Sequence, residues 1–130
     1  MTTSAEGGPL EGCNILLVED EYFVAIRLER ALVDHGANII ASLSQLDAAY
    51  EFIFQNEARA DVAILDINLS GKLSFPLADD LAIHGVPVIF LSGYDDNFVP
   101  AGYRSRPRLQ KPVAVLQVVL TIQNLLGLPA

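Results

Sequence analysis

The chain has 130 residues, a formal net charge of −8 and a hydrophobic fraction of 52%. This length suits one domain with a hydrophobic core of its own, and the excess of acidic residues argues against direct binding to nucleic acid. No apolar run approaches the roughly 20 residues that a membrane-spanning helix needs. The single cysteine, Cys13, excludes an internal disulfide and fits a reducing compartment. We therefore expect a cytoplasmic protein whose partner is neither a membrane nor a nucleic acid.

One domain is predicted over residues 13–127. Residues 1–12 are predicted to form a flexible tail, and their start lacks the basic region and apolar run of a signal peptide. After Leu126 the chain has no room for a DNA-binding or catalytic module, so no output domain is expected.

Short apolar segments alternate with amphipathic ones along this domain. Buried strands are predicted at 14–18, 38–42, 62–69, 86–91 and 108–110. Helices are predicted at about 22–35, 44–56, 75–84 and 113–126, where apolar residues recur every three to four positions. Pro100, Gly102 and Pro107 argue against a good helix between the fourth and fifth strands.

This alternation predicts an α/β fold in which helices cover both faces of a parallel sheet, a three-layer sandwich. Five strands suit the order 2-1-3-4-5. The connection between strands four and five is expected to be a weak helix or a loop.

Polar side chains stand at the ends of four of these strands. Glu19 and Asp20 follow the first strand, Asp66 lies in the third, Ser92 follows the fourth and Lys111 follows the fifth. In a sheet of the predicted order these strand ends meet at one edge, which is where ligands bind in open α/β sheets. We therefore expect these side chains to form one site.

Each of these groups has a chemical use. Asp20 and Asp66 can share a hard cation such as Mg²⁺ or Mn²⁺, and the backbone carbonyl of Asn68 can add an oxygen ligand. Asp66 can attack phosphorus as a carboxylate nucleophile. The cation and the Lys111 ammonium would neutralise charge on the phosphoryl oxygens, and the Ser92 hydroxyl would donate to one of them. A simpler interpretation stays open, in which the acids point to water and cap the turns and helices that follow.

Four segments together resemble the receiver domain of bacterial response regulators over about residues 14–126. They are Val18-Glu19-Asp20-Glu21, Leu65-Asp66-Ile67-Asn68, Leu91-Ser92-Gly93 and Lys111-Pro112. The resemblance implies a flavodoxin-like (βα)5 fold. It also implies a role for each matching residue: Asp66 as phosphoacceptor, Asp20 and Asp66 as Mg²⁺ ligands, Glu19 in the outer shell of the metal, Ser92 as the switch hydroxyl, and Lys111, before a cis proline bond, as the phosphoryl-binding group.

The chain also departs from the common receiver pattern. Arg108 stands where receivers usually carry an aromatic switch residue, and Ser70 stands where many have proline. The segment 90–94 resembles the Phe-Ala-Thr-Gly-aromatic motif of a subclass of single-domain receivers in alphaproteobacteria, which lacks that aromatic switch. Two interpretations of Tyr94 are open: it replaces the missing aromatic, or it is a surface tyrosine.

The resemblance implies a single-domain response regulator of a phosphorelay. Asp66 would take a phosphoryl group from a sensor histidine kinase or a histidine phosphotransfer protein. The protein would then bind an unknown downstream protein or act as a phosphate sink, as a monomer or weak dimer. It would not be an enzyme, although self-phosphorylation from small donors and self-dephosphorylation fit this chemistry.

Two alternatives belong to other classes of protein. One is a receiver-fold binding module that is never phosphorylated. The other is a phosphatase with an aspartyl nucleophile, because Asp66-Ile67-Asn68 resembles the Asp-x-Asp start of the haloacid dehalogenase type.

Overall fold

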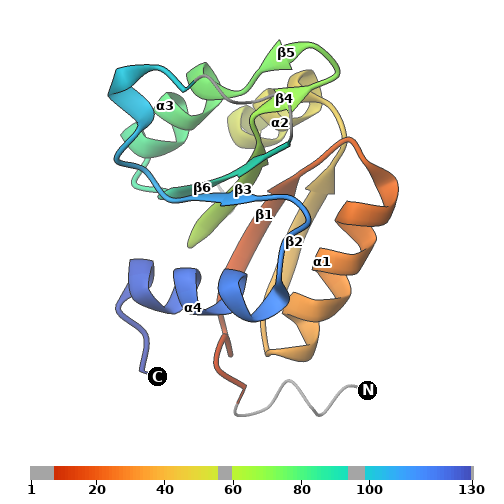
Figure 1. The fold of residues 1–130 in the computed structure, drawn as a ribbon, viewed down its shortest axis with the longest axis vertical. Helices are drawn as coiled ribbons and strands as arrows, with labels where there is room; N and C mark the ends of the chain where they lie inside the picture. The colour runs from red at the N-terminus through yellow and green to blue at the C-terminus, as the bar shows by residue number, and fades with distance from the viewer. Residues whose placement is uncertain (1–7, 56–59, 94–98, 130) are drawn as a thin grey trace.

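A five-stranded parallel sheet forms the middle layer of the molecule (Figure 1), in a computed structural model that describes residues 8–55, 60–93 and 99–129. Its strands are β1 (Asn14–Val18), β2 (Asn38–Leu43), β3 (Val62–Asp66), β6 (Val88–Ser92) and β7 (Arg108–Gln110). They lie in the order β2-β1-β3-β6-β7 and every pair is parallel. The predicted order 2-1-3-4-5 is therefore confirmed.

Two helices cover each face of the sheet. On one face lie α1 (Tyr22–Asp34) and α4 (Val115–Leu126), and on the other lie α2 (Leu46–Gln55) and α3 (Phe75–Ile83) (Figure 1). The central strands β3 and β6 are buried along their whole length because both of their faces are covered. Within the described ranges, no helix is long and apolar enough to cross a membrane.

The third predicted strand, 62–69, is shorter than expected, because pairing in the main sheet stops at Asp66. After it, β4 (Asn68–Leu69) and β5 (Lys72–Leu73) form a small antiparallel hairpin. Its two turn residues, Ser70 and Gly71, have φ angles of 54° and 91°. A two-residue turn with positive φ at both positions is the usual connection of a tight hairpin. The apolar residue Leu69 extends the strand-like pattern because it packs in the core beneath the hairpin, not because it continues the sheet.

The connection between β6 and β7 contains a single 3₁₀ turn (Ala101–Tyr103, η2) in its described part, as expected from its proline and glycine content. The Tyr103 ring stacks on Phe75 of α3, with 4.6 Å between the ring centroids. Its hydroxyl donates to Asp79 at 2.6 Å, and Arg106 donates to the same carboxylate at 3.0 Å. Asp79 thus ties this connection to α3.

Part of the predicted tail belongs to the core. Leu10 is fully buried and its N–H donates to the carbonyl of His35 at 2.8 Å. The apolar side chain at position 10 fills the space between the end of α1 and the start of β1, so packing begins before residue 13. Residues 1–7 lie outside the described part of the chain.

Candidate functional site

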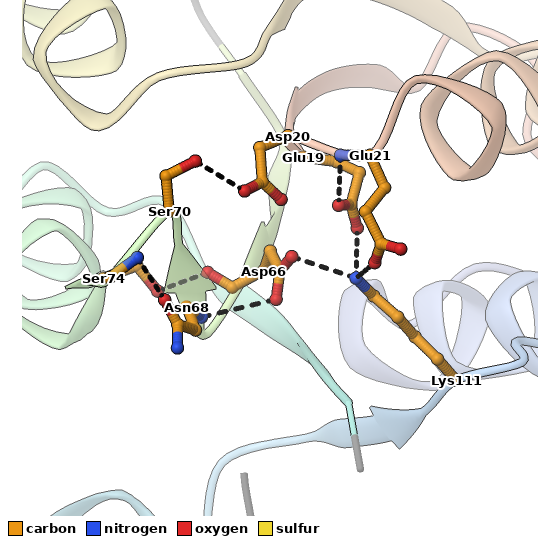
Figure 2. A network of polar contacts seen from close by, with 9 residues as sticks. Glu19, Asp20, Glu21, Asp66, Asn68, Ser70, Ser74 and Lys111 are labelled. Atoms are coloured by element: carbon orange, nitrogen blue, oxygen red, sulfur yellow. Dashed lines mark hydrogen bonds and ion pairs between the residues drawn. The ribbon is translucent and has the colours of Figure 1, made fainter. Parts of the chain in front are cut away.

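The predicted acidic and basic residues come together at the carboxyl edge of the sheet (Figure 2). Glu19 and Asp20 follow β1, Asp66 is the last residue of β3, and Lys111 follows β7. Glu19, Asp20 and Asp66 each offer one carboxylate oxygen, and these three oxygens lie within 4.8 Å of one another. The parallel strands thus gather residues that are far apart in the sequence.

Backbone N–H groups hold the two buried carboxylates in place. Glu19 and Asp66 are 2% and 3% exposed. The N–H of Glu21 donates to Glu19 at 2.9 Å, and the N–H of Asn68 donates to Asp66 at 3.3 Å. The buried Ser74 hydroxyl donates to the backbone carbonyl of Asp66 at 2.7 Å. Residues of the segment after β3 therefore hold both the side chain and the backbone carbonyl of Asp66.

Lys111 meets three carboxylates. Its Nζ lies 2.6 Å from Glu21, 2.9 Å from Asp66 and 2.9 Å from Glu19. Its backbone N–H donates to the carbonyl of Ser92 at 2.8 Å, and the Lys111–Pro112 peptide bond is cis, as the family resemblance implied. This backbone path directs the ammonium toward Asp66 across the end of β6.

Burial and crowding shift the pKa values of these groups. Burial raises the pKa of Glu19 to about 7, and it also raises the pKa of Asp66, although Lys111 opposes that shift. Burial alone would lower the pKa of Lys111, but its carboxylate partners outweigh burial and raise it. Burial likewise works against Asp20, yet its pKa is lowered because hydrogen bonds, led by that from Ser70, favour the charged form. The site thus holds more carboxylates than one ammonium can neutralise.

The donor set fits a hard divalent cation. Two carboxylates about 4 Å apart repel by roughly 4 kcal/mol at an effective dielectric near 20, and a cation between them offsets that repulsion. The buried Glu19 Oε1 atom lies 2.9 Å from the Lys111 Nζ, and among the described residues it has no partner besides that ammonium. An all-oxygen cluster of this kind is the chemistry that Mg²⁺ or Mn²⁺ prefers.

The other predicted site residues fall into three groups. Ser92 is buried at the end of β6, and Asn68 lies at the start of the hairpin beside Asp66, where its side-chain oxygen accepts the Gly71 N–H at 2.7 Å. Arg108 is exposed on the edge strand β7. Tyr94 lies outside the described residues.

Three residues that sequence reasoning did not assign also belong to the site: Glu21, Ser70 and Ser74. Glu21 occupies the N-cap position of α1, but its side chain makes no capping hydrogen bond and contacts Lys111 instead. The Ser70 hydroxyl donates to Asp20 at 2.9 Å. These contacts join segments distant in the chain, so a local sequence pattern carries no signal for them.

Solved structures resemble this one closely. A response regulator receiver protein from Burkholderia phymatum is 26% identical over 91% of this chain and 98% of its own, with a TM-score of 0.78. SdrG from Sphingomonas melonis Fr1 is 33% identical over 85% of this chain and 94% of its own, with a TM-score of 0.73. This chain belongs to the response regulator receiver family.

The receiver domain of PhyR from Erythrobacter litoralis shares the receiver fold, with a TM-score of 0.73 at 24% identity, over 92% of this chain and 94% of its own. No protein-family model and no curated protein matches the chain. The family resemblance drawn from the strand-end motifs is therefore confirmed by structural similarity.

Proposed function

We propose that this receiver accepts a phosphoryl group on Asp66 from a sensor histidine kinase or a histidine phosphotransfer protein. The observation that carries the proposal is the position of Asp66: a buried carboxylate 2.9 Å from Lys111 and within the acidic cluster of Glu19 and Asp20. Family membership supports it, because receivers are signalling modules of two-component systems.

The transfer is a displacement at phosphorus. An Asp66 carboxylate oxygen attacks the phosphorus of a phosphohistidine, a P–O bond forms and the P–N bond breaks. The histidine nitrogen leaves with the electron pair, and the product on this chain is an acyl phosphate. Hydrolysis returns the chain to its unphosphorylated state: water attacks the phosphorus of the acyl phosphate, inorganic phosphate is released and Asp66 regains its free carboxylate.

Each nearby side chain has a part in that step. Lys111 neutralises charge on the phosphoryl oxygens, and the Ser92 hydroxyl donates to one of them once the group is in place. Asp20 and Asp66, with the backbone carbonyl of Asn68, would hold Mg²⁺ or Mn²⁺, with Glu19 in the outer shell. The bound cation would supply further neutralisation of the phosphoryl charge.

The phosphoryl group would serve a signalling role rather than turnover of a substrate. It adds about −1.5 to −2 charge at the end of the sheet. We propose that the phosphorylated form binds a downstream protein, or that the receiver acts as a phosphate sink, as a single-domain cytoplasmic protein that is a monomer or weak dimer. Tyr94 and Arg108 are candidates for tuning this response, since they flank the site in the chain.

The test uses acetyl phosphate as a small donor, with and without Mg²⁺, and intact mass as the measurement. We expect one phosphoryl adduct that requires Mg²⁺ and is absent in Asp66→Asn. Asp34→Asn is the matched control, because Asp34 is an exposed residue at the end of α1 and the substitution makes the same chemical change away from the site.

The two alternatives give different results in the same experiment. A binding module that is never phosphorylated would show no adduct even at saturating Mg²⁺. A phosphatase would hydrolyse a generic phosphate ester, such as p-nitrophenyl phosphate, through many turnovers. The first result would contradict the proposed phosphoacceptor role of Asp66, and the second would contradict the proposed signalling role.

A further inference from the structure

Glu21 makes the shortest of the three carboxylate contacts to Lys111. The distance from Nζ is 2.6 Å to Glu21 and 2.9 Å to each of Glu19 and Asp66 (Figure 2). The three carboxylates differ in their surroundings: the side chain of Glu21 is 60% exposed, whereas those of Glu19 and Asp66 are 0% and 5% exposed. Glu21 is thus the solvent-facing partner of a largely buried ammonium.

The helix does not need the Glu21 side chain. Glu21 is the N-cap residue of α1, with φ −87° and ψ 110°, and its side chain makes no capping hydrogen bond. Its backbone carbonyl accepts the Ala25 N–H and its own N–H donates to Glu19, and neither bond involves the carboxylate. Among the described residues, Lys111 is the partner of that carboxylate.

An ammonium has three protons to donate, and Lys111 already faces three carboxylates. Phosphorylation of Asp66 would replace its free carboxylate with a phosphoryl group that carries three acceptor oxygens and about −1.5 to −2 charge. Lys111 can give more than one of its three protons to this group only if Glu19 or Glu21 is released. Glu19 is buried and would be left uncompensated, so its release is costly. Glu21 can return to water, which makes its release the less unfavourable of the two.

We propose that Glu21 acts as a latch, a positioning residue whose ion pair with Lys111 holds the ammonium in the unphosphorylated state. This ion pair must break when Asp66 is phosphorylated. This inference rests on the proposed phosphoacceptor function of Asp66. The latch opposes the phosphorylated state, because that state must first break the Glu21–Lys111 ion pair. Removing the latch should therefore favour the phosphorylated form.

Two substitutions distinguish an effect of the Glu21–Lys111 contact from an effect of the Glu21 charge alone. Glu21→Gln removes the charge and keeps the length of the side chain. Glu21→Asp keeps the charge but shortens the side chain by one methylene, and an aspartate at the N-cap accepts hydrogen bonds from backbone N–H groups in the first turn of α1 instead. A latch that acts through contact with Lys111 is weakened by both substitutions, whereas a general charge effect is relieved by Glu21→Gln alone.

The measurement is the dissociation constant of beryllofluoride in the presence of saturating Mg²⁺, followed by NMR titration, because beryllofluoride mimics the phosphoryl group without a covalent step. We expect both variants to bind it about two- to fivefold more tightly than the wild type, the range typical of a partly exposed ion pair. Glu51→Gln on the exposed face of α2 is the matched control and should leave the constant unchanged. Thermal melting without Mg²⁺ confirms that each variant is folded.

Each remaining outcome overturns the latch. Tighter binding by Glu21→Gln but not Glu21→Asp would mean that charge, not contact, matters. Weaker or unchanged binding in both variants would mean that Glu21 supports Lys111 or is neutral. If the wild type gives neither a beryllofluoride complex nor an adduct with acetyl phosphate, the proposed function fails as well. If the wild type gives both and the variants do not differ from it, the latch alone fails.

Discussion

At the scale of single residues, burial decides what each ionisable group does. Glu19 and Asp66 differ from surface carboxylates because they have lost water and gained fixed partners at the end of the sheet. Burial favours the neutral form of an acid, and an opposite charge favours the ionised form. Lys111 therefore favours the ionised form of Asp66 in a position where burial alone disfavours it.

The same reasoning applies to Cys13, which is remote from the site. Cys13 is 5% exposed, and its burial, with the nearby negative charge of Asp61, raises its pKa to about 11 from 9.0. A raised pKa means that the neutral thiol stabilises the folded state fully below pH 9. That stabilisation is lost as the pH rises from 9 to 11, because the unfolded chain ionises first.

We therefore predict that the free energy of unfolding falls between pH 9 and 11, by at most about 2–3 kcal/mol from this residue. Denaturant unfolding across this pH range measures the slope, and Cys13→Ala should flatten it even though the substitution lowers stability overall. An identical slope in wild type and variant would contradict the prediction. Iodoacetamide should also modify the native protein at pH 8 far more slowly than the denatured chain.

At the scale of elements, the β4–β5 hairpin contributes a contact to the acidic cluster of Glu19, Asp20 and Asp66. In its turn Ser70 has a φ of 54° and donates its hydroxyl to Asp20. The turn is held by the buried side chain of Leu69 and by the hydrogen bond from the Gly71 N–H to the Asn68 side chain. Proline, which many receivers carry at this position, has a φ near −65° and cannot adopt this turn. The hairpin and the serine therefore belong together.

We predict that Ser70→Gly weakens Mg²⁺ binding about two- to tenfold, because Asp20 loses the hydrogen bond that fixes its orientation. Glycine adopts positive φ without strain, so the turn itself should survive. Isothermal titration with MgCl₂ gives the affinity. Ser70→Thr is the matched control, since it keeps the hydroxyl, and it should bind Mg²⁺ more tightly than Ser70→Gly. Equal affinities for wild type and Ser70→Gly would show that the hydroxyl has no role in metal binding.

The elements also show what the sequence could and could not predict. Strand order and helix positions follow from hydrophobic periodicity, which reports burial on one or two faces. Asp20, Asp66 and Lys111 could be placed together because strand ends in a parallel sheet share one edge. The break after Asp66 was missed, because Leu69 is apolar for core packing and continues the strand-like pattern. Glu21 and Ser70 were missed because their partners lie 90 and 50 positions away.

At the scale of the whole molecule, the aromatic contacts of Tyr103 join the connection between β6 and β7 to the α3 side of the sheet. The connection from β6 to β7 has one 3₁₀ turn in its described part, yet Tyr103 packs against Phe75 and Phe90, and Asp79 bonds both Tyr103 and Arg106. These contacts cover part of the sheet on the side where α3 lies. The fold thus keeps both core layers with four α-helices among the described residues.

From the net charge of −8 and the acidic cluster, we expect cations to stabilise the fold. A ligand that binds the native state alone adds RT ln(1 + [L]/Kd), about 2.7 kcal/mol at a hundred times Kd. We predict that saturating MgCl₂ raises the melting temperature by several degrees beyond the effect of NaCl at equal ionic strength, because screening acts on all charges while Mg²⁺ also fills one site.

Asp20→Asn should abolish the part of this shift that is specific to Mg²⁺ and leave the part due to ionic strength. Asp34→Asn should preserve both parts, because Asp34 is exposed on α1 and away from the cluster. A specific shift that survives in Asp20→Asn would place the cation elsewhere on the acidic surface. Loss of the shift in Asp20→Asn alone would tie the stability of the whole domain to the carboxylates that the proposed phosphoryl transfer uses.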